Sequence, residues 1–186
     1  MLNTILGSLS SGVAASTSSY ESIASATGTG SSSTITFSSI PSGYASLQIR
    51  GISSTPDAVT DAVGNIRFNS DSGSNYASHL LYGNGSSASA VGLASRTNLF
   101  GAVYVPGTTY NSNIRGAMIV DILDYTSTTK YKTVRFFGGM DTNGGVSYVV
   151  LNSGLWMSTS AITSITIDFV QNASTTSTFA LYGIKG

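Results

Sequence analysis

The chain has 186 residues, enough for one domain with a buried core, and 41% of them are hydrophobic. Only 9% are charged, with 8 Lys and Arg against 8 Asp and Glu, whereas Ser, Thr and Gly number 34, 22 and 21. This composition excludes nucleic-acid binders, which need clustered Lys and Arg, and it excludes the highly charged, weakly hydrophobic class of disordered chains.

Cysteine is absent, so disulfides and thiolate metal sites cannot form. The longest apolar runs are far shorter than the roughly 20 residues of a membrane span. The N-terminus lacks a positive region and a continuous apolar stretch, so no secretory signal is predicted. We therefore expect no membrane partner.

Residues 1–19 are predicted to be an N-terminal arm and joint. Leu2, Ile5, Leu6 and Leu9 recur at spacings of three and four, the period of one helical face. Gly7 and Gly12 interrupt this stretch at a cost of about 1 kcal/mol each relative to Ala, so the apolar stripe needs a partner. It either packs back on its own domain or docks on a neighbouring subunit or an underlying surface. Small and polar residues over 14–19 would serve as the flexible joint.

From Tyr20 onward the pattern is typical of β-structure, and residues 20–186 are predicted to form a single domain. Alternating apolar and polar residues predict strands at 34–38, 46–52, 65–68, 76–82, 97–105, 114–123, 131–137, 146–155, 164–170 and 178–184. Turn-forming clusters rich in Gly, Asn, Asp and Pro separate them, and no helical period intervenes. Nine or ten short strands of this kind predict an all-β fold, an antiparallel, jelly-roll-like β-sandwich.

Two details of these strands are specific enough to test. Gly116 and the pair Gly138-Gly139 predict strand breaks, because glycine weakens a strand interior. Residues 118–123 are nearly all apolar and predict a central strand covered on both faces. Asp121 in that strand either faces outward at a subunit contact or pairs with Arg115 or Arg135.

The residue inventory leaves little room for catalysis. His79 is the only histidine, no Gly-x-Ser-x-Gly motif accompanies it, and its apolar neighbours predict a half-exposed sheet residue. Glu21 is the only glutamate, and the pairs Asp57/Asp61 and Asp121/Asp124 have no spacing that implies acid–base work. We predict no catalytic residue and no cofactor.

Two further features, residues 69–75 and Trp156, could contact a ligand, but each has a structural interpretation that we favour. Residues 69–75 place oxygen-bearing side chains at alternate positions, as half a calcium loop does, but lack the closing bidentate Glu, so no metal site is predicted. Trp156 could stack on a sugar, but it follows an apolar strand, which favours core packing.

Several ordered blocks together resemble small structural proteins of tailed bacteriophages, including phages of cyanobacteria. The blocks are YESIA (20–24), ITFSSIPS (35–42), LQIRG (47–51), NSDSGSNY (69–76), VDILDY (120–125), KYKTVR (130–135) and FALYGIKG (179–186). The resemblance implies a virion protein with a β-sandwich body and no catalytic residues, and it carries no functional residue over from a motif.

Two placements follow from this resemblance. A capsid decoration (cement) protein would sit on the outer capsid surface as a homotrimer and clamp neighbouring copies of the major capsid protein. A tail-fibre or receptor-binding head would project from the virion tail and contact host glycans. The short chain, the brief arm and the lack of a repetitive shaft favour decoration. In that role Leu2, Ile5, Leu6 and Leu9 are predicted to help anchor the protein to the capsid.

Overall fold

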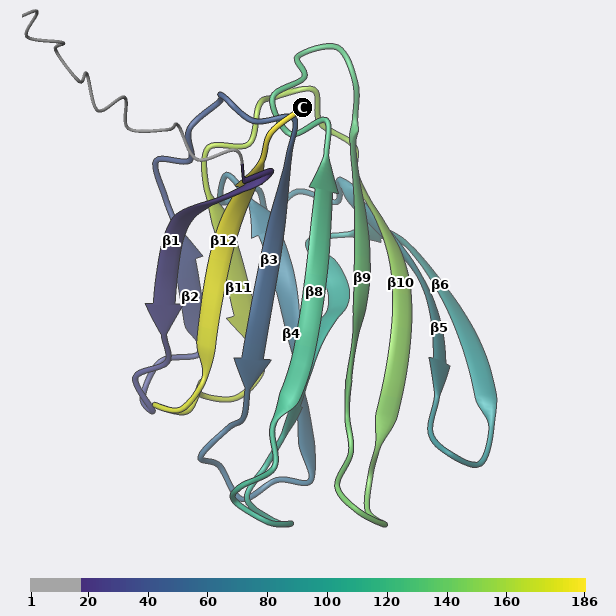
Figure 1. Cartoon of the computed structure of the whole chain (residues 1–186). Helices are drawn as coiled ribbons and strands as arrows, with labels where there is room; N and C mark the ends of the chain where they lie inside the picture. Colours follow the sequence, from purple (N-terminus) through teal and green to yellow (C-terminus); the bar gives the residue numbers. More distant parts are fainter. Residues whose placement is uncertain (1–17) are drawn as a thin grey trace, which may run out of the picture.

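A computed structural model describes residues 18–186 as two antiparallel sheets packed face to face (Figure 1). In chain order the strands are β1 (Tyr20–Thr27), β2 (Thr34–Phe37), β3 (Ser46–Ser53), β4 (Asp61–Phe68), β5 (Tyr76–Gly83), β6 (Ala88–Arg96), β7 (Leu99–Pro106), β8 (Gly116–Leu123), β9 (Lys132–Met140), β10 (Tyr148–Trp156), β11 (Ile165–Phe169) and β12 (Thr178–Ile184). The predicted all-β antiparallel sandwich is confirmed. No helix long and apolar enough to cross a membrane occurs within the described range.

The large sheet has eight strands in the order β1-β12-β3-β8-β9-β10-β5-β6, and the small sheet has four in the order β2-β11-β4-β7. The pairs β2–β11, β3–β8, β4–β7 and β5–β6 are nested within one another along the chain. Such nesting arises when one long hairpin is folded over two sheets. The β9–β10 hairpin is inserted between β8 and β5.

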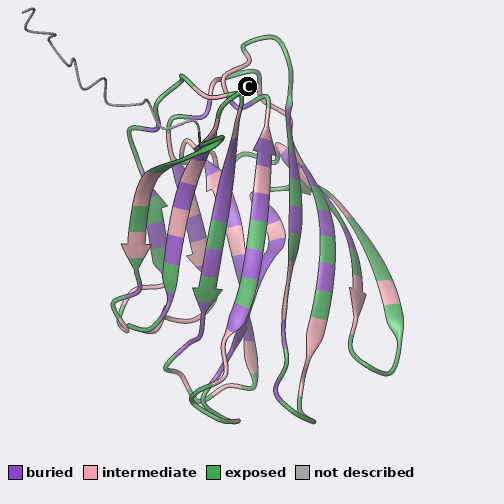
Figure 2. Ribbon diagram, in the orientation of Figure 1, coloured by how far each residue is buried: buried purple, intermediate pink, exposed green. Residues whose placement is uncertain are grey.

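Alternation along the strands builds the core between the sheets. Figure 2 shows buried and exposed bands alternating along β8 and β10, as expected where one sheet face is covered. Both sheets contribute fully buried side chains, among them Ile66 and Ile167 from the small sheet and Ile49 and Val120 from the large one. Trp156 is buried in this core, as predicted.

Two strands were not anticipated from the sequence, β1 and β6. Strand β6 consists mainly of Ala, Ser and Gly, which carry little intrinsic preference for strands. It forms because it pairs with β5 over most of its length, from Gly83↔Ala88 to Ser78↔Leu93. It lies at the free edge of the large sheet and is exposed on most of its length (Figure 2).

The predicted strand break at Gly138-Gly139 is wrong, since β9 continues through both residues to Met140. A Cβ on Gly138 would lie 2.6 Å from the carbonyl oxygen of Ala117, and one on Gly139 would lie 2.1 Å from that of Tyr148. These glycines therefore allow close approach of neighbouring strands instead of ending one. Gly116 is the first residue of β8, so the expected interruption there is the start of the strand.

The expectation that residues 118–123 are covered on both faces is also wrong for the single chain. Strand β8 is central, between β3 and β9, but of residues 118–123 only the inward Met118, Val120 and Ile122 are buried. On the other face Ile119 is exposed. Nothing within residues 18–186 forms a layer over that side of the large sheet (Figure 1).

One buried polar side chain, Lys132, ties loops to the sandwich. The Nζ of Lys132, a fully buried residue, donates hydrogen bonds to the carbonyl oxygens of Ser127, Lys130 and Ser158. Burial lowers the pKa of Lys132, and the charge of Asp124 partly opposes that shift. These bonds join the loop before β9 to the segment that follows β10.

Candidate functional site

The outer face of the large sheet, which points away from the small sheet, is the candidate site. The register places Ile119 opposite Phe137, Phe137 opposite Leu151, and Leu151 opposite Leu81, so these side chains form one row across β8, β9, β10 and β5. The row spans about 14 Å, from three strand spacings of about 4.8 Å. Directly opposed side chains in such a row touch one another.

A second apolar row on the same face lies two residues along each strand from the first. It runs from Ile52 through Ala117 and Gly139 to Val149. We call the six large side chains of the two rows the apolar strip. Their exposed fractions are 49% for Ile52, 52% for Leu81, 40% for Ile119, 54% for Phe137, 54% for Val149 and 52% for Leu151. About half of each side chain is therefore open to solvent on a single copy.

On the opposite side of the first row lies a polar row of Gln48, Asp121, Arg135, Ser153 and His79. Asp121 accepts a hydrogen bond of 2.7 Å from Gln48 Nε2 and pairs with Arg135 at 3.4 Å. Asp121 thus faces outward and pairs with one of its two predicted partners. The other, Arg115, donates instead to the carbonyl oxygens of Ser112 and Ile114.

Arg50, at the β3 end of the first apolar row, is also held within the chain. Its Nε donates to Gln48 Oε1 over 2.7 Å, and its guanidinium lies over the rings of Tyr20 and Tyr182 at 5.0 and 5.4 Å from their centroids. The charges beside the apolar strip are consequently neutralised or bonded internally. This face offers a partner apolar contacts flanked by charged groups that are hydrogen-bonded within the chain.

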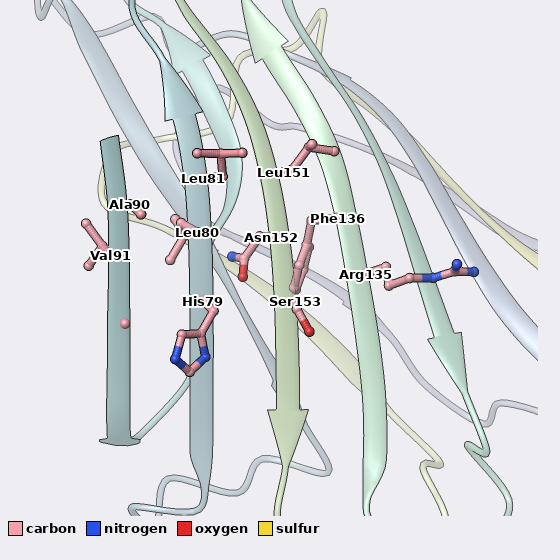
Figure 3. A pocket seen from close by; sticks show the side chains of 11 residues that line it. His79, Leu80, Leu81, Ala90, Val91, Arg135, Phe136, Leu151, Asn152 and Ser153 are labelled. Atoms are coloured by element: carbon pink, nitrogen blue, oxygen red, sulfur yellow. The ribbon is translucent and has the colours of Figure 1, made fainter. Parts of the chain in front are cut away.

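A hollow of about 540 Å³ lies where β5, β6, β9 and β10 adjoin (Figure 3). Its lining includes the polar residues His79, Arg135, Asn152 and Ser153 and the apolar residues Leu81 and Leu151. In Figure 3 the guanidinium of Arg135 points away from the imidazole of His79, so the two groups do not converge on one point.

His79 is an exposed residue of β5, close to the half-exposed sheet residue predicted. A Cβ on Gly92 of the neighbouring β6 would lie 3.0 Å from its Nε2, so the ring packs against the backbone of β6. Its opposite neighbour on β10 is Ser153. This environment positions the imidazole against the sheet edge and gives it no carboxylate partner among the hydrogen bonds of residues 18–186.

The calcium-like stretch 69–75 works as a hydrogen-bonded turn. Asp71 Oδ2 accepts from Trp156 Nε1 at 2.8 Å, and Oδ1 accepts from Gly73 N at 2.8 Å; both oxygens also face Asn75 Nδ2. Burial alone would raise the pKa of Asp71, but the hydrogen bonds from Trp156, Asn75 and Gly73 outweigh it and lower that pKa. Both carboxylate oxygens thus have donors from the chain itself.

Two further acidic residues, Asp57 and Asp124, serve loops. Asp57 Oδ2 accepts from Thr55 Oγ1 at 3.2 Å and from the backbone nitrogen of Asn172 at 3.1 Å, which joins two loops at one end of the sandwich. Asp124 has a φ of 53° and its carbonyl oxygen accepts from Ser127 N at 2.9 Å, the geometry of a turn residue. The structure does not bring these carboxylates together with Asp121.

The apolar strip itself was missed by the sequence reasoning, although a signal for it exists. Neighbouring apolar residues such as Phe136-Phe137 and Leu80-Leu81 within one strand must point to opposite faces. One member of each pair is buried, and the other lies in the strip. The predicted anchor residues Leu2, Ile5, Leu6 and Leu9 lie outside the described residues.

Comparison of the chain with protein-family models, with curated proteins and with solved structures found no match.

Proposed function

We propose that this chain is a non-enzymatic structural protein of a phage virion, specifically a decoration protein of the outer capsid surface that binds the major capsid protein. The observation that carries a docking role is the outer face of the large sheet, where six large apolar side chains are half-exposed and the adjacent charges are paired internally. A face of this kind suits contact with protein. The ordered sequence blocks support the virion as its setting.

The distribution of charge supports docking without long-range electrostatic attraction. Four ion pairs lie within the domain, Arg67–Asp168, Lys130–Asp124, Arg135–Asp121 and Lys185–Glu21. Half of the basic groups and half of the acidic groups of the chain are therefore used in internal pairs. Contacts with a partner then depend on apolar side chains and neutral hydrogen bonds, which salt screens little.

A decoration protein stabilises the shell by mass action, because it binds assembled capsid and not free capsid subunits. In this proposal Leu2, Ile5, Leu6 and Leu9 supply the capsid anchor, motivated by their helical spacing and by the joint that follows them. The core described over 18–186 is built by side chains from both sheets, so the fold of the body can be followed separately from occupancy on the capsid.

Deleting residues 1–13 tests the anchor. We expect the truncated protein to remain folded and to be lost from purified particles, while replacing Ser8, Ser10 and Ser11 with Ala leaves occupancy unchanged. Circular dichroism reports folding, and densitometry of purified particles reports occupancy. Full occupancy by the truncated protein would show that the arm is not the anchor.

Counting copies per particle tests the placement. Decoration of a capsid predicts hundreds of copies, because the shell offers a repeating lattice of sites. A tail fibre predicts a few tens or fewer. Quantitative mass spectrometry against the major capsid protein distinguishes these outcomes.

The hollow beside His79 favours one alternative, a tail-fibre or receptor-binding head that contacts host glycans. Its wall combines apolar side chains with the polar atoms of His79, Arg135 and Ser153, groups that can pack against and hydrogen-bond a sugar. Under this alternative the purified protein binds host cells and blocks infection, and Arg135→Ala weakens both effects. A decoration protein does neither.

A further inference from the structure

The outer face of the large sheet carries the pattern of a covered surface. On β5, β8, β9 and β10, apolar residues occupy the inner face, and the outer face carries the apolar strip beside the polar row. Strands that are apolar on both faces are typical of sheets with a layer on each side. The small sheet covers the inner face, and the outer face of the single chain has no such layer.

We propose that a second copy of this chain covers the apolar strip, so that the outer face of the large sheet is a self-association surface. This inference rests on the proposed function and narrows it, since it assigns the strip, proposed above as a protein-docking face, to a second copy of the chain and leaves contact with the capsid to the arm. Its test needs no capsid, so the two proposals can fail separately.

The size of the strip fits a contact between copies. Six side chains that are each about half-exposed present on the order of 600 Å² of largely apolar surface, the upper end of the largest patch on a typical monomer. A stable interface buries about 800 Å² per partner, most of which the strip and its immediate border would supply.

The shape of the outer face of the large sheet also suits contact with the same face of a second copy. Small residues lie between the large ones and leave hollows beside them. One hollow of about 250 Å³ is lined by Leu81, Tyr82, Gly83, Ala88, Phe137, Val149 and Leu151, and another of about 290 Å³ by Ala117, Met118, Ile119, Phe137, Gly138, Gly139 and Val149. The same surface therefore holds both protruding side chains and spaces that can receive them, which a self-complementary contact requires.

The charges at the border do not oppose a second copy. Asp121 is bonded to Gln48 and Arg135, and Arg50 is bonded to Gln48 and lies over the rings of Tyr20 and Tyr182, so each of these charged groups keeps a partner within its own chain when the face is covered. A copy is also the occupant present from the moment of synthesis. A capsid lattice would cover the strip only after assembly, leaving the free protein with an exposed patch that promotes aggregation.

The oligomeric state of the full chain tests this proposal. We expect light scattering after size-exclusion chromatography, at micromolar concentration, to give a multiple of the 19.1 kDa chain mass. Phe137→Lys should shift the mass to that of one chain, because it places a charge at the centre of the strip. Val170→Lys is the matched control, since Val170 is 68% exposed and lies outside the large sheet, and it should keep the oligomer.

A second measurement, the reactivity of an introduced thiol, leaves the side chains of the strip unchanged. It tests the proposal even if the Phe137→Lys variant does not fold. Because the chain has no cysteine, a single introduced thiol reports local exposure. The thiol is introduced either by Ser153→Cys or by Ser160→Cys. Ser153 lies next to the strip on β10, and Ser160 lies in an exposed loop. We expect the thiol at 153 to react at least several-fold more slowly with a maleimide than the thiol at 160, with the difference vanishing on dilution to monomer.

Three results obtained with the free protein would overturn the proposal. They are a monomeric wild-type chain, a folded Phe137→Lys variant of wild-type mass, and equal reactivity of the two thiols in an oligomer. Protection of the thiol at 153 only on particles would assign the strip to a capsid subunit instead. A monomer that still occupies particles fully would leave the decoration role intact while excluding self-association.

Discussion

The indole Nε1 of Trp156 donates a hydrogen bond of 2.8 Å to the Oδ2 of Asp71, 85 positions earlier in the chain. The bond connects the end of β10 to the turn after β4. The indole also stacks on Tyr76, with centroids 6.2 Å apart, and packs on Phe68 at 5.4 Å. The turn over residues 69–75, whose sequence resembles half a calcium loop, thus supports one end of the core through its hydrogen bonds.

Trp156→Phe should lower the free energy of unfolding by about 2–4 kcal/mol, since it removes a hydrogen bond to a charged group and leaves a partial cavity. Urea titration followed by circular dichroism measures the change. Tyr131→Phe, at a side chain 53% exposed, is the control and should change stability by less than about 0.5 kcal/mol. Equal stability of the two variants would contradict a structural role for the indole.

The lowered pKa of Asp71 predicts an acid-dependent stability. Because the folded state binds this proton less readily than the unfolded chain, the stabilisation is complete above the ordinary carboxyl pKa of about 3.9 and is lost as pH falls through the lower folded value. Asp71→Asn should therefore cost about 1–3 kcal/mol near pH 7, and the gap to wild type should narrow in strong acid. A gap that stays constant from neutral pH into strong acid would exclude this ionisation as its source.

Lys132→Met should destabilise the domain by about 1–3 kcal/mol, because the carbonyl oxygens of Ser127, Lys130 and Ser158 lose their common donor. Lys130→Met makes the same chemical change at an exposed pair with Asp124 and should cost less than about 1 kcal/mol. Thermal and urea unfolding of both variants measure the difference. Equal costs would mean that the buried amine contributes no more than a surface charge.

Gly51→Ala should destabilise the domain by about 1–3 kcal/mol, because the added Cβ would lie 2.4 Å from a ring carbon of buried Phe179. Gly43→Ala adds the same methyl group where no atom lies within 4 Å, and it should be neutral or stabilising by up to about 1 kcal/mol. Urea midpoints of the two variants compare the effects. A neutral Gly51→Ala would show that the Phe179 ring moves freely.

Binding to the capsid should change little with salt, since the proposed anchor residues of the arm are apolar and the domain pairs many of its charges internally. We expect occupancy of particles to be equal, within measurement error, between about 0.05 and 0.5 M NaCl. Co-sedimentation of protein with stripped particles measures it. A steep loss of binding with salt would indicate an electrostatic contact instead.

Much of the fold could be predicted from local pattern. Alternation identified ten of the twelve strands, because a strand with one covered face buries every second side chain. Strand β6 was not predicted because its residues have little preference for strands, and it forms only through pairing with β5. The glycines of β9 were misinterpreted because their role is close approach to Ala117 and Tyr148, which lie on neighbouring strands.

The candidate site was less accessible to prediction. The sequence shows Phe136-Phe137 and Leu80-Leu81 as apolar pairs, and strand alternation assigns one member of each to the outer face. It does not show that Phe137 lies opposite Leu151 and that Leu151 lies opposite Leu81. Those adjacencies come from strand order, which places β10 between β9 and β5 although β5 comes much earlier in the chain.

By itself, the sequence determined the class of the fold, the scarcity of charge and the burial of Trp156, since these follow from composition and from a two-residue period. Only the tertiary structure decided that the apolar strip is contiguous and uncovered, that Asp121 pairs with Arg135, and that Asp71 holds Trp156. The physical reason is that local pattern sets which way a side chain points, whereas its neighbours across the sheet depend on long-range strand pairing and register.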